Sequence, residues 1–257
     1  MKPTKQPHHF PGPGTLDRAL NLVRFLRREC PWDAQQTAES LIPHLLEEAH
    51  EVVDAIRHGD DRELESELGD LLLNLAFQIV VAEEASDIDA DSVYARLESK
   101  MIARHPDIFG SGQRQEWEAL KNRERTEDQG VLSGLAKGLD PLTRSYRIQE
   151  RVASVGFDWE DARSAIDKVE EELSEAADAL DSEDFLEEVG DLLFACVNLS
   201  RLGGSHPTTA LARANAKFIR RFEQLESLAR KRAIDLSTAG LEELNELWDE
   251  IKLMERQ

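Results

Sequence analysis

The sequence predicts an all-α protein that consists of two tandem, four-helix-bundle-like helical domains. Three observations support this prediction. Strand signals are almost absent along the 257 residues. Apolar residues instead recur at steps of three and four over long segments, which is the period of an amphipathic helix. Several sequence blocks also occur twice in the same order, which indicates two copies of one helical unit.

The first half of the chain is expected to form a helical hairpin. Residues 45–57 and 62–81 have the helical spacing, and the sequence HGDD at 58–61 separates them. Glycine suits the end of a helix, and aspartate side chains cap the start of the next one. A tight turn is therefore predicted at residues 58–61.

The second half repeats this plan. Residues 162–180 and 184–202 are predicted to be helical, with DSE at 181–183 as the turn of an antiparallel hairpin. A Gly-rich stretch between the halves predicts a linker. The expected divisions are a flexible tail at 1–15, an N-terminal domain at 16–126, a linker at 127–142 and a C-terminal domain at 143–257.

The internal repeat extends beyond the hairpins. Its blocks are CPWD and GFDW at 30–33 and 156–159, LLEEAHE and VEEELSE at 45–51 and 169–175, ESELGDLL and LEEVGDLL at 65–72 and 186–193, a Lys-x-x-x-Arg pair at 100–104 and 217–221, and a Trp-acid-x-x-Lys block at 117–121 and 248–252. Five blocks in one order are difficult to obtain by chance, so a duplication of one unit is predicted.

The bulk composition is typical of a soluble globular protein. The formal net charge of −21 disfavours nucleic-acid binding, because an acidic surface repels phosphate backbones. The longest apolar stretch, at 71–82, contains two polar amides and is too short to cross a membrane. The chain has two cysteines and an N-terminus without an apolar signal core, so a reducing, cytoplasmic setting is expected.

Carboxylates on the second predicted hairpin form the main candidate site. Glu172 and Glu175 are three residues apart, as are Glu188 and Asp191, so each pair occupies one helix face. The two pairs lie at similar distances from the turn, which places them at about the same height in the hairpin. Four converging carboxylates repel each other unless a cation lies between them. Asp191 also precedes an apolar LLF segment that is expected to be buried, where a carboxylate needs a partner.

The ligand chemistry favours a hard cation. Carboxylate oxygens without a nearby His or Cys suit Mg²⁺, with Mn²⁺ as a substitute. Mg²⁺ leaves positions for water and phosphate oxygens, as in metal-assisted phosphate chemistry. A di-iron bundle would need Glu-x-x-His ligands, which the sequence lacks at these positions. Acidic helix faces that are only solvated are the simpler alternative.

Basic and aromatic residues are candidates for contacts with a phosphorylated ligand. Lys168 lies four residues before Glu172, while Lys217 and Arg221 share one face of a later helix. Lysine and arginine bind phosphate oxygens, and Trp248 offers a ring that can stack on a base. Surface ion pairs for the cations, and a core position for the tryptophan, are the alternatives.

In combination, these motifs resemble the MazG family of the all-α NTP pyrophosphatase superfamily. The motifs that carry the resemblance are CPWD with QT at 30–37, the EExxE and ExxD pairs, HPDIF at 105–109, GFDW at 156–159 and KFIRRF at 217–222. The resemblance extends from about residue 16 to the end. It implies a homodimeric enzyme that hydrolyses NTPs and dNTPs to the monophosphate and pyrophosphate with Mg²⁺.

The resemblance assigns this activity to the C-terminal domain. It implies metal binding by Glu172, Glu175, Glu188 and Asp191, and nucleotide binding by Lys168, Lys217, Arg221 and Trp248. Glu171 and Glu172 are the catalytic candidates, with Glu171 as the residue that would orient or deprotonate the attacking water.

The N-terminal copy is a possible second metal site. Its corresponding residues are Glu47, Glu48, Glu51, Glu67 and Asp70, with Lys100, Arg104 and Trp117. His44 stands where the second copy has Lys168, and neutral histidine is a weaker phosphate ligand than lysine. Turnover in this copy stays open, with dimerisation or regulation as alternative roles.

Two other functions fit the same residues. A narrower relative, such as a dUTP or phosphoribosyl-ATP pyrophosphatase, would share the site and differ in its substrate. A non-enzymatic acidic helical adaptor would release no pyrophosphate from any nucleotide. The duplicated Lys-x-x-x-Arg pairs count against the adaptor, because it does not need them beside a metal site.

Overall fold

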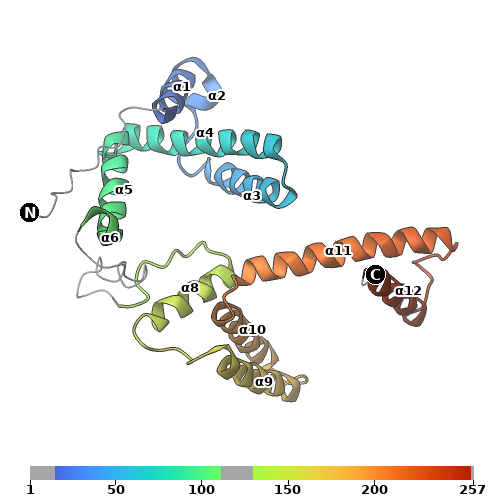
Figure 1. The fold of residues 1–257 in the computed structure, drawn as a ribbon. Helices are drawn as coiled ribbons and strands as arrows, with labels where there is room; N and C mark the ends of the chain where they lie inside the picture. Colours follow the sequence, from blue (N-terminus) through green and yellow to red (C-terminus); the bar gives the residue numbers. More distant parts are fainter. Residues whose placement is uncertain (1–14, 111–129, 256–257) are drawn as a thin grey trace, which may run out of the picture. The chain divides into compact units, whose positions relative to one another are not determined.

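The computed structural model describes residues 15–110 and 130–255. Within these ranges every regular element is a helix and no strand is present, which confirms the predicted all-α class (Figure 1). The chain divides into two compact units, residues 1–120 and 121–257. The predicted tail up to residue 14, Trp117 and the first three residues of the predicted linker lie outside the described residues.

The N-terminal unit is organised around a helical hairpin. Its helices are α1 (Thr15–Glu29), α2 (Pro31–Ala34), α3 (Ile42–His58), α4 (Asp61–Ala85), α5 (Ala90–Arg104) and α6 (Pro106–Phe109). The chain turns between α3 and α4 at Gly59, whose φ of 71° is a left-handed conformation that glycine adopts without steric cost. Asp60 caps α4 by accepting hydrogen bonds from the backbone N–H groups of Arg62 and Glu63. The predicted turn at 58–61 is therefore confirmed.

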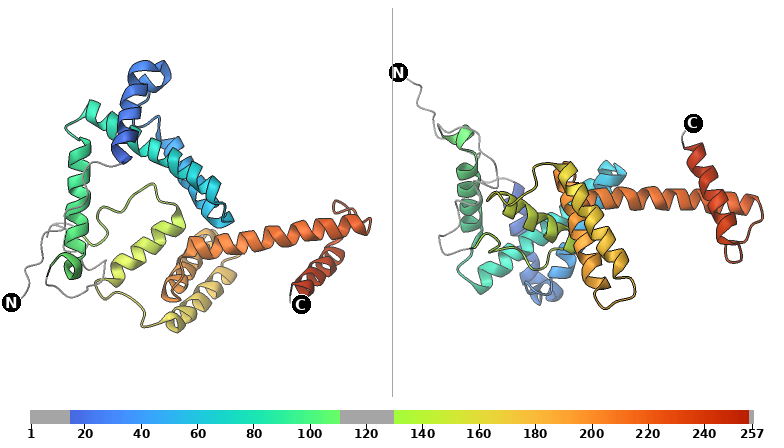
Figure 2. Two further views of the ribbon diagram at one scale, coloured as in Figure 1. Left: turned by 45° about the horizontal axis from the view of Figure 1, so that its top comes forward. Right: turned by 90° about the horizontal axis from the view of Figure 1, so that it is seen from below.

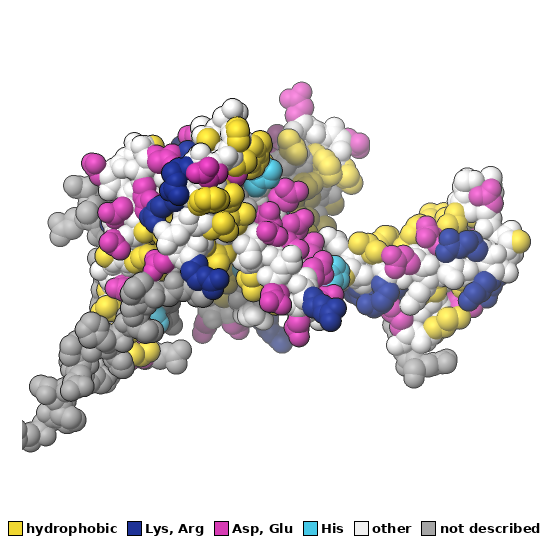
Figure 3. Space-filling view, turned by 90° about the horizontal axis from the view of Figure 1, so that it is seen from above, with side chains coloured by type: hydrophobic (Ala, Val, Ile, Leu, Met, Phe, Trp, Pro, Cys, Tyr) yellow, Lys and Arg dark blue, Asp and Glu magenta, His cyan; other side chains and the backbone are white. Residues whose placement is uncertain are grey.

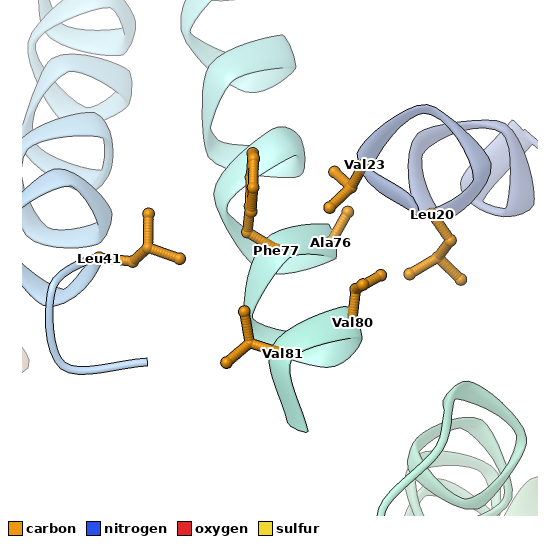
Figure 4. Close-up of a cluster of buried hydrophobic side chains, with 7 residues drawn as sticks. All are labelled: Leu20, Val23, Leu41, Ala76, Phe77, Val80 and Val81. Atoms are coloured by element: carbon orange, nitrogen blue, oxygen red, sulfur yellow. The ribbon is translucent and has the colours of Figure 1, made fainter. Parts of the chain in front are cut away.

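The core of this unit lies where α1 crosses α4. Seven buried residues form it: Leu20, Val23, Leu41, Ala76, Phe77, Val80 and Val81. Figure 4 shows Leu20 and Val23 of α1 facing Ala76 and Val80 of α4, while Val81 points to the other side, toward Leu41. Beside this core, Arg27 lies 2.5 Å from Glu84 and donates hydrogen bonds to the backbone oxygens of Asp33 and Gln36. Arg27 thus ties the CPWD segment to both α1 and α4.

The C-terminal unit contains the second hairpin and a two-helix arm. Its helices are α8 (Pro141–Ala153), α9 (Ala162–Asp178), α10 (Phe185–Leu202), α11 (Pro207–Lys231) and α12 (Leu241–Met254). Figures 1 and 2 show α9 beside α10, and α12 beside the C-terminal part of α11. Leu225 and Ala229 of α11 pack against the buried Leu247 and Ile251 of α12. We call α11 and α12 together the arm.

One expectation about burial is wrong. The LLF segment after Asp191 was expected to be buried, but Leu193 is 55% exposed and Phe194 is 38% exposed. The reason is that α8, α9 and α11 together cover only part of the surface of α10, so its remaining apolar side chains stay open to solvent. Figure 3 shows other apolar side chains at the surface among charged ones.

Hydropathy gives no sign of a membrane span. Of the helices in the described ranges, none combines the length and the apolar character that crossing a bilayer requires.

Candidate metal and nucleotide site

The α9–α10 hairpin brings three of the four predicted carboxylates together. One carboxylate oxygen each from Glu172, Glu188 and Asp191 lies within 4.8 Å of the other two. The register follows from the antiparallel helices, which rise at the same rate on either side of the turn. Glu175 is outside this group, but it is close enough to Glu188 for its charge to raise the pKa of that carboxyl.

Burial within this group differs from the expectation. Glu172 is the buried member, with 6% of its surface exposed, whereas Asp191 is exposed. The pKa of Glu188 is raised above its ordinary value. The largest cause is burial, and the next are the negative charges of Glu175, Asp191 and Glu172. The folded hairpin therefore disfavours full ionisation of the cluster unless positive charge is nearby.

Lys168 supplies positive charge at the edge of the cluster. Its Nζ lies 2.7 Å from Oε1 of Glu172 and donates a hydrogen bond to Glu171 at 3.0 Å. These two hydrogen bonds raise the pKa of Lys168, so the amine is protonated at neutral pH. The buried carboxylate of Glu172 is thus paired, as a buried charge must be.

The donor set fits a small divalent cation. Glu172, Glu188 and Asp191 would each offer one carboxylate oxygen to such an ion, and these oxygens already lie within 4.8 Å of one another. No histidine or cysteine belongs to the cluster, and hard oxygen ligands favour Mg²⁺ or Mn²⁺ over softer metals.

The other predicted nucleotide contacts gather on the arm. Arg221 of α11 lies over the ring of Trp248 of α12, with its Cζ 6.0 Å from the ring centroid. Trp248 also packs against Phe218 at a centroid distance of 5.1 Å, one residue beyond the exposed Lys217. Within the described ranges, no hydrogen bond or ion pair joins this group to the carboxylates of α9 and α10.

Sequence reasoning missed one member of the arm group. Glu255, the residue that follows α12, forms ion pairs with Arg221 at 2.6 Å and Arg220 at 3.1 Å. The partners are more than 30 residues apart, and no helical spacing relates them. Only the return of α12 along α11 brings them together.

The N-terminal hairpin forms a similar carboxylate group. Glu48, Glu67 and Asp70 bring one oxygen each within 4.8 Å of one another. Burial, then neighbouring acids including Glu51, raises the pKa of both Glu48 and Glu67.

The cation beside the acids distinguishes the two hairpins. His44 lies 3.6 Å from Glu47, and among the described residues no lysine or arginine forms an ion pair with Glu48. Lys100 and Arg104 lie one turn apart on α5. The lysine that pairs with Glu172 therefore has no counterpart of the same charge and position in the N-terminal hairpin.

Comparison with known proteins gives the same duplication. The model of a family described as the MazG nucleotide pyrophosphohydrolase domain matches residues 36–109 and 160–225, which contain the two carboxylate hairpins. The predicted tandem domains are thereby confirmed.

Two of the similar proteins match along nearly their whole length. A nucleoside triphosphate pyrophosphohydrolase/pyrophosphatase MazG of Thermotoga maritima is 39% identical over 92% of this chain and 95% of its own. A nucleoside triphosphate pyrophosphohydrolase of Escherichia coli K12 is 36% identical, over 93% and 98% respectively. The uncharacterized protein YabN of Bacillus subtilis is 35% identical over 92% of this chain and 51% of its own. The chain belongs to the MazG nucleotide pyrophosphohydrolase family.

Proposed function

We propose that this protein hydrolyses nucleoside triphosphates to the monophosphate and pyrophosphate, and that the α9–α10 hairpin carries the activity. The observation behind the proposal is the carboxylate group of Glu172, Glu188 and Asp191 with Lys168 paired to its buried member. Family membership supports the reaction, since two full-length relatives are named for it.

The metal in this proposal is Mg²⁺, with Mn²⁺ as a substitute. Glu172, Glu175, Glu188 and Asp191 would hold it through carboxylate oxygens. When bound, the ion supplies positive charge that stabilises the carboxylates and the phosphate oxygens of the substrate.

Lys168 is proposed to bind a phosphate oxygen while it stays paired with the acids. A lysine ammonium has three N–H donors, and two are directed at Glu172 and Glu171. The third is available to the substrate. Glu171 accepts from Lys168 through Oε1 and retains Oε2, so it is proposed to orient or deprotonate the attacking water.

The arm is proposed to bind the rest of the nucleotide. Lys217 and Arg221 would bind the phosphate oxygens of the nucleotide, and Trp248 would stack on the base. Stacking tolerates every base, which supports a substrate range that is not restricted to one base. The proposed substrates are both NTPs and dNTPs. Assays across a nucleotide panel that includes dUTP and phosphoribosyl-ATP separate this range from the narrower specificities.

A homodimer is part of the proposal. Exposed apolar side chains line both the hairpin and the arm: Ile166, Leu173, Leu180, Leu193, Leu211, Phe218, Ile219 and Phe222. Such apolar surface is uncommon on monomers and is typical of subunit interfaces. Light scattering is expected to give twice the mass of the 29.0 kDa chain, and a monomer at micromolar concentration would contradict this part.

The direct test removes the cluster. E172A and D191A are each expected to abolish Mg²⁺-dependent pyrophosphate release, because each removes a ligand oxygen. E48A and D70A make the corresponding changes in the N-terminal hairpin. If these two variants lose activity and E172A and D191A keep it, the N-terminal hairpin carries the reaction. Full activity in E172A and D191A would show that the site assignment is wrong. The adaptor alternative predicts no pyrophosphate from the unmodified protein.

A further inference from the structure

The arm holds an ion-pair network in which Glu255 and Arg220, unlike Arg221, have no part in the proposed reaction. Glu255 accepts a hydrogen bond from Nε of Arg221 at 2.8 Å, and the same oxygen lies 2.6 Å from Nη2. The other oxygen of Glu255 accepts from Nη2 of Arg220 at 3.1 Å. One carboxylate therefore serves two guanidinium groups.

This arrangement occupies one edge of the Arg221 guanidinium. Arginine has five N–H donors in a planar fork, and Glu255 takes the edge formed by Nε and Nη2. Among the described residues, no acceptor contacts Nη1 of Arg221. The edge formed by Nη1 and the second N–H of Nη2 thus offers two parallel donors, which is the geometry that binds phosphate oxygens.

An aromatic platform lies against the same group. The Trp248 ring lies below Arg221, and it packs on Phe218, which stacks on Phe222 at 6.1 Å with an interplanar angle of 11°. Trp248 also borders the buried core of the arm. The Arg221 side chain is only 21% exposed, so both its position and its orientation are restrained.

The charges leave the network positive. Two arginines and one glutamate carry a net charge of +1, and the exposed Lys217 lies one helical turn before Arg221. The hydrogen bonds from Arg221 and Arg220 lower the pKa of Glu255, so it stays ionised at neutral pH. A phosphate group that approaches Arg221 therefore meets positive charge although Glu255 is present.

We propose that Glu255 is a positioning residue for nucleotide binding: it holds the Arg221 guanidinium over Trp248 so that the Nη1 edge faces the substrate phosphates. This inference rests on the proposed function, in which Arg221 binds the nucleotide. Glu255 contacts Arg221 and Arg220, and not the substrate. If Glu255 instead competed with phosphate for Arg221, removing Glu255 would strengthen nucleotide binding, whereas the proposed positioning role predicts weaker binding.

The test compares E255A with a matched control in the full-length protein. Glu250 accepts from Arg232 at 2.7 Å and also ties α12 to the end of α11, but it does not contact Arg221. E255A is expected to raise the KM for ATP with Mg²⁺ about tenfold, with kcat changed less than about twofold, because ground-state binding geometry is lost. E250A is expected to leave KM unchanged. E255D, which keeps the charge, is expected to restore part of the affinity.

Three outcomes would overturn the inference. An unchanged KM in E255A shows that Arg221 needs no positioning. Equal increases of KM in E255A and E250A show a general loss of arm stability, which thermal unfolding of both variants would reveal. A decrease of KM shows competition with phosphate.

An R221A variant separates this inference from the proposed function. If R221A leaves KM unchanged, the proposed role of Arg221 is wrong, and the inference falls with it. If R221A raises KM but E255A does not, only the inference is wrong. If both are right, adding E255A to R221A produces no further increase, because Glu255 acts through Arg221.

Discussion

Neutralising one carboxylate of the α9–α10 cluster is expected to have opposite effects on stability without and with Mg²⁺. D191N is the cleanest change, because asparagine keeps the shape of the side chain and no cation pairs with Asp191 among the described residues. Without metal, the variant removes a repulsion. With metal, it removes a ligand.

The size of the effect follows from the distances. At 4.8 Å, the separation within which the Asp191 and Glu188 oxygens lie, two unit charges repel by about 0.9 kcal/mol in water and about 3.5 kcal/mol at an effective dielectric constant of 20. The lower figure applies because Asp191 is exposed. D191N is therefore expected to be more stable by about 1 kcal/mol in EDTA, which raises Tm by roughly 2–4 °C.

Mg²⁺ is expected to reverse this order. At a concentration of 100 Kd, the ion stabilises the unmodified protein by about 2.7 kcal/mol. If D191N binds Mg²⁺ tenfold more weakly, the ion stabilises it by only about 1.4 kcal/mol at the same concentration. D191N is then no longer more stable than the unmodified protein. Thermal unfolding in EDTA and across a Mg²⁺ titration measures both effects, with D87N at an exposed loop residue as the charge control. The reasoning is refuted if D191N is no more stable than the unmodified protein in EDTA and gains as much from Mg²⁺.

Three further predictions follow from the same contacts. The pKa of Glu188 is raised, so without metal its contribution to stability is complete below the ordinary value of 4.5 and is lost as pH rises through the raised value. Mg²⁺ needs the ionised carboxylate and should therefore bind more tightly as pH rises through the same range. Calorimetry that gives equal Mg²⁺ affinities at pH 5 and pH 7 would contradict this. K168H gives the second hairpin a histidine, as the first hairpin has at His44, and should lower kcat/KM at least about tenfold at pH 8, because a neutral imidazole replaces a charged donor. An unchanged rate of pyrophosphate release in this variant would argue against the role of Lys168. F77A should destabilise the N-terminal unit by about 3–5 kcal/mol, because Phe77 is a buried member of its core. A loss below about 1 kcal/mol in urea unfolding would show that this core is not formed as described.

The fold class and the hairpins were predictable because their signals are local. An apolar period of three to four residues reports the helix whatever surrounds it, and the residues around Gly59 and Asp60 report the turn. The approach of Glu172 to Glu188 and Asp191 was also predictable, since the helical rise and the length of the turn fix the register. The sequence by itself thus determined the helices, the duplication and the pairing of the acids.

Tertiary structure alone decided which side chains are covered and which distant residues pair. Glu172 is buried and Asp191 is exposed because helix packing covers one face of α9 and leaves part of α10 open. Arg221 pairs with Glu255 because α12 folds back along α11, and no local pattern encodes that return. Burial and long-range pairing depend on the elements that meet at a surface, which a helical period does not specify.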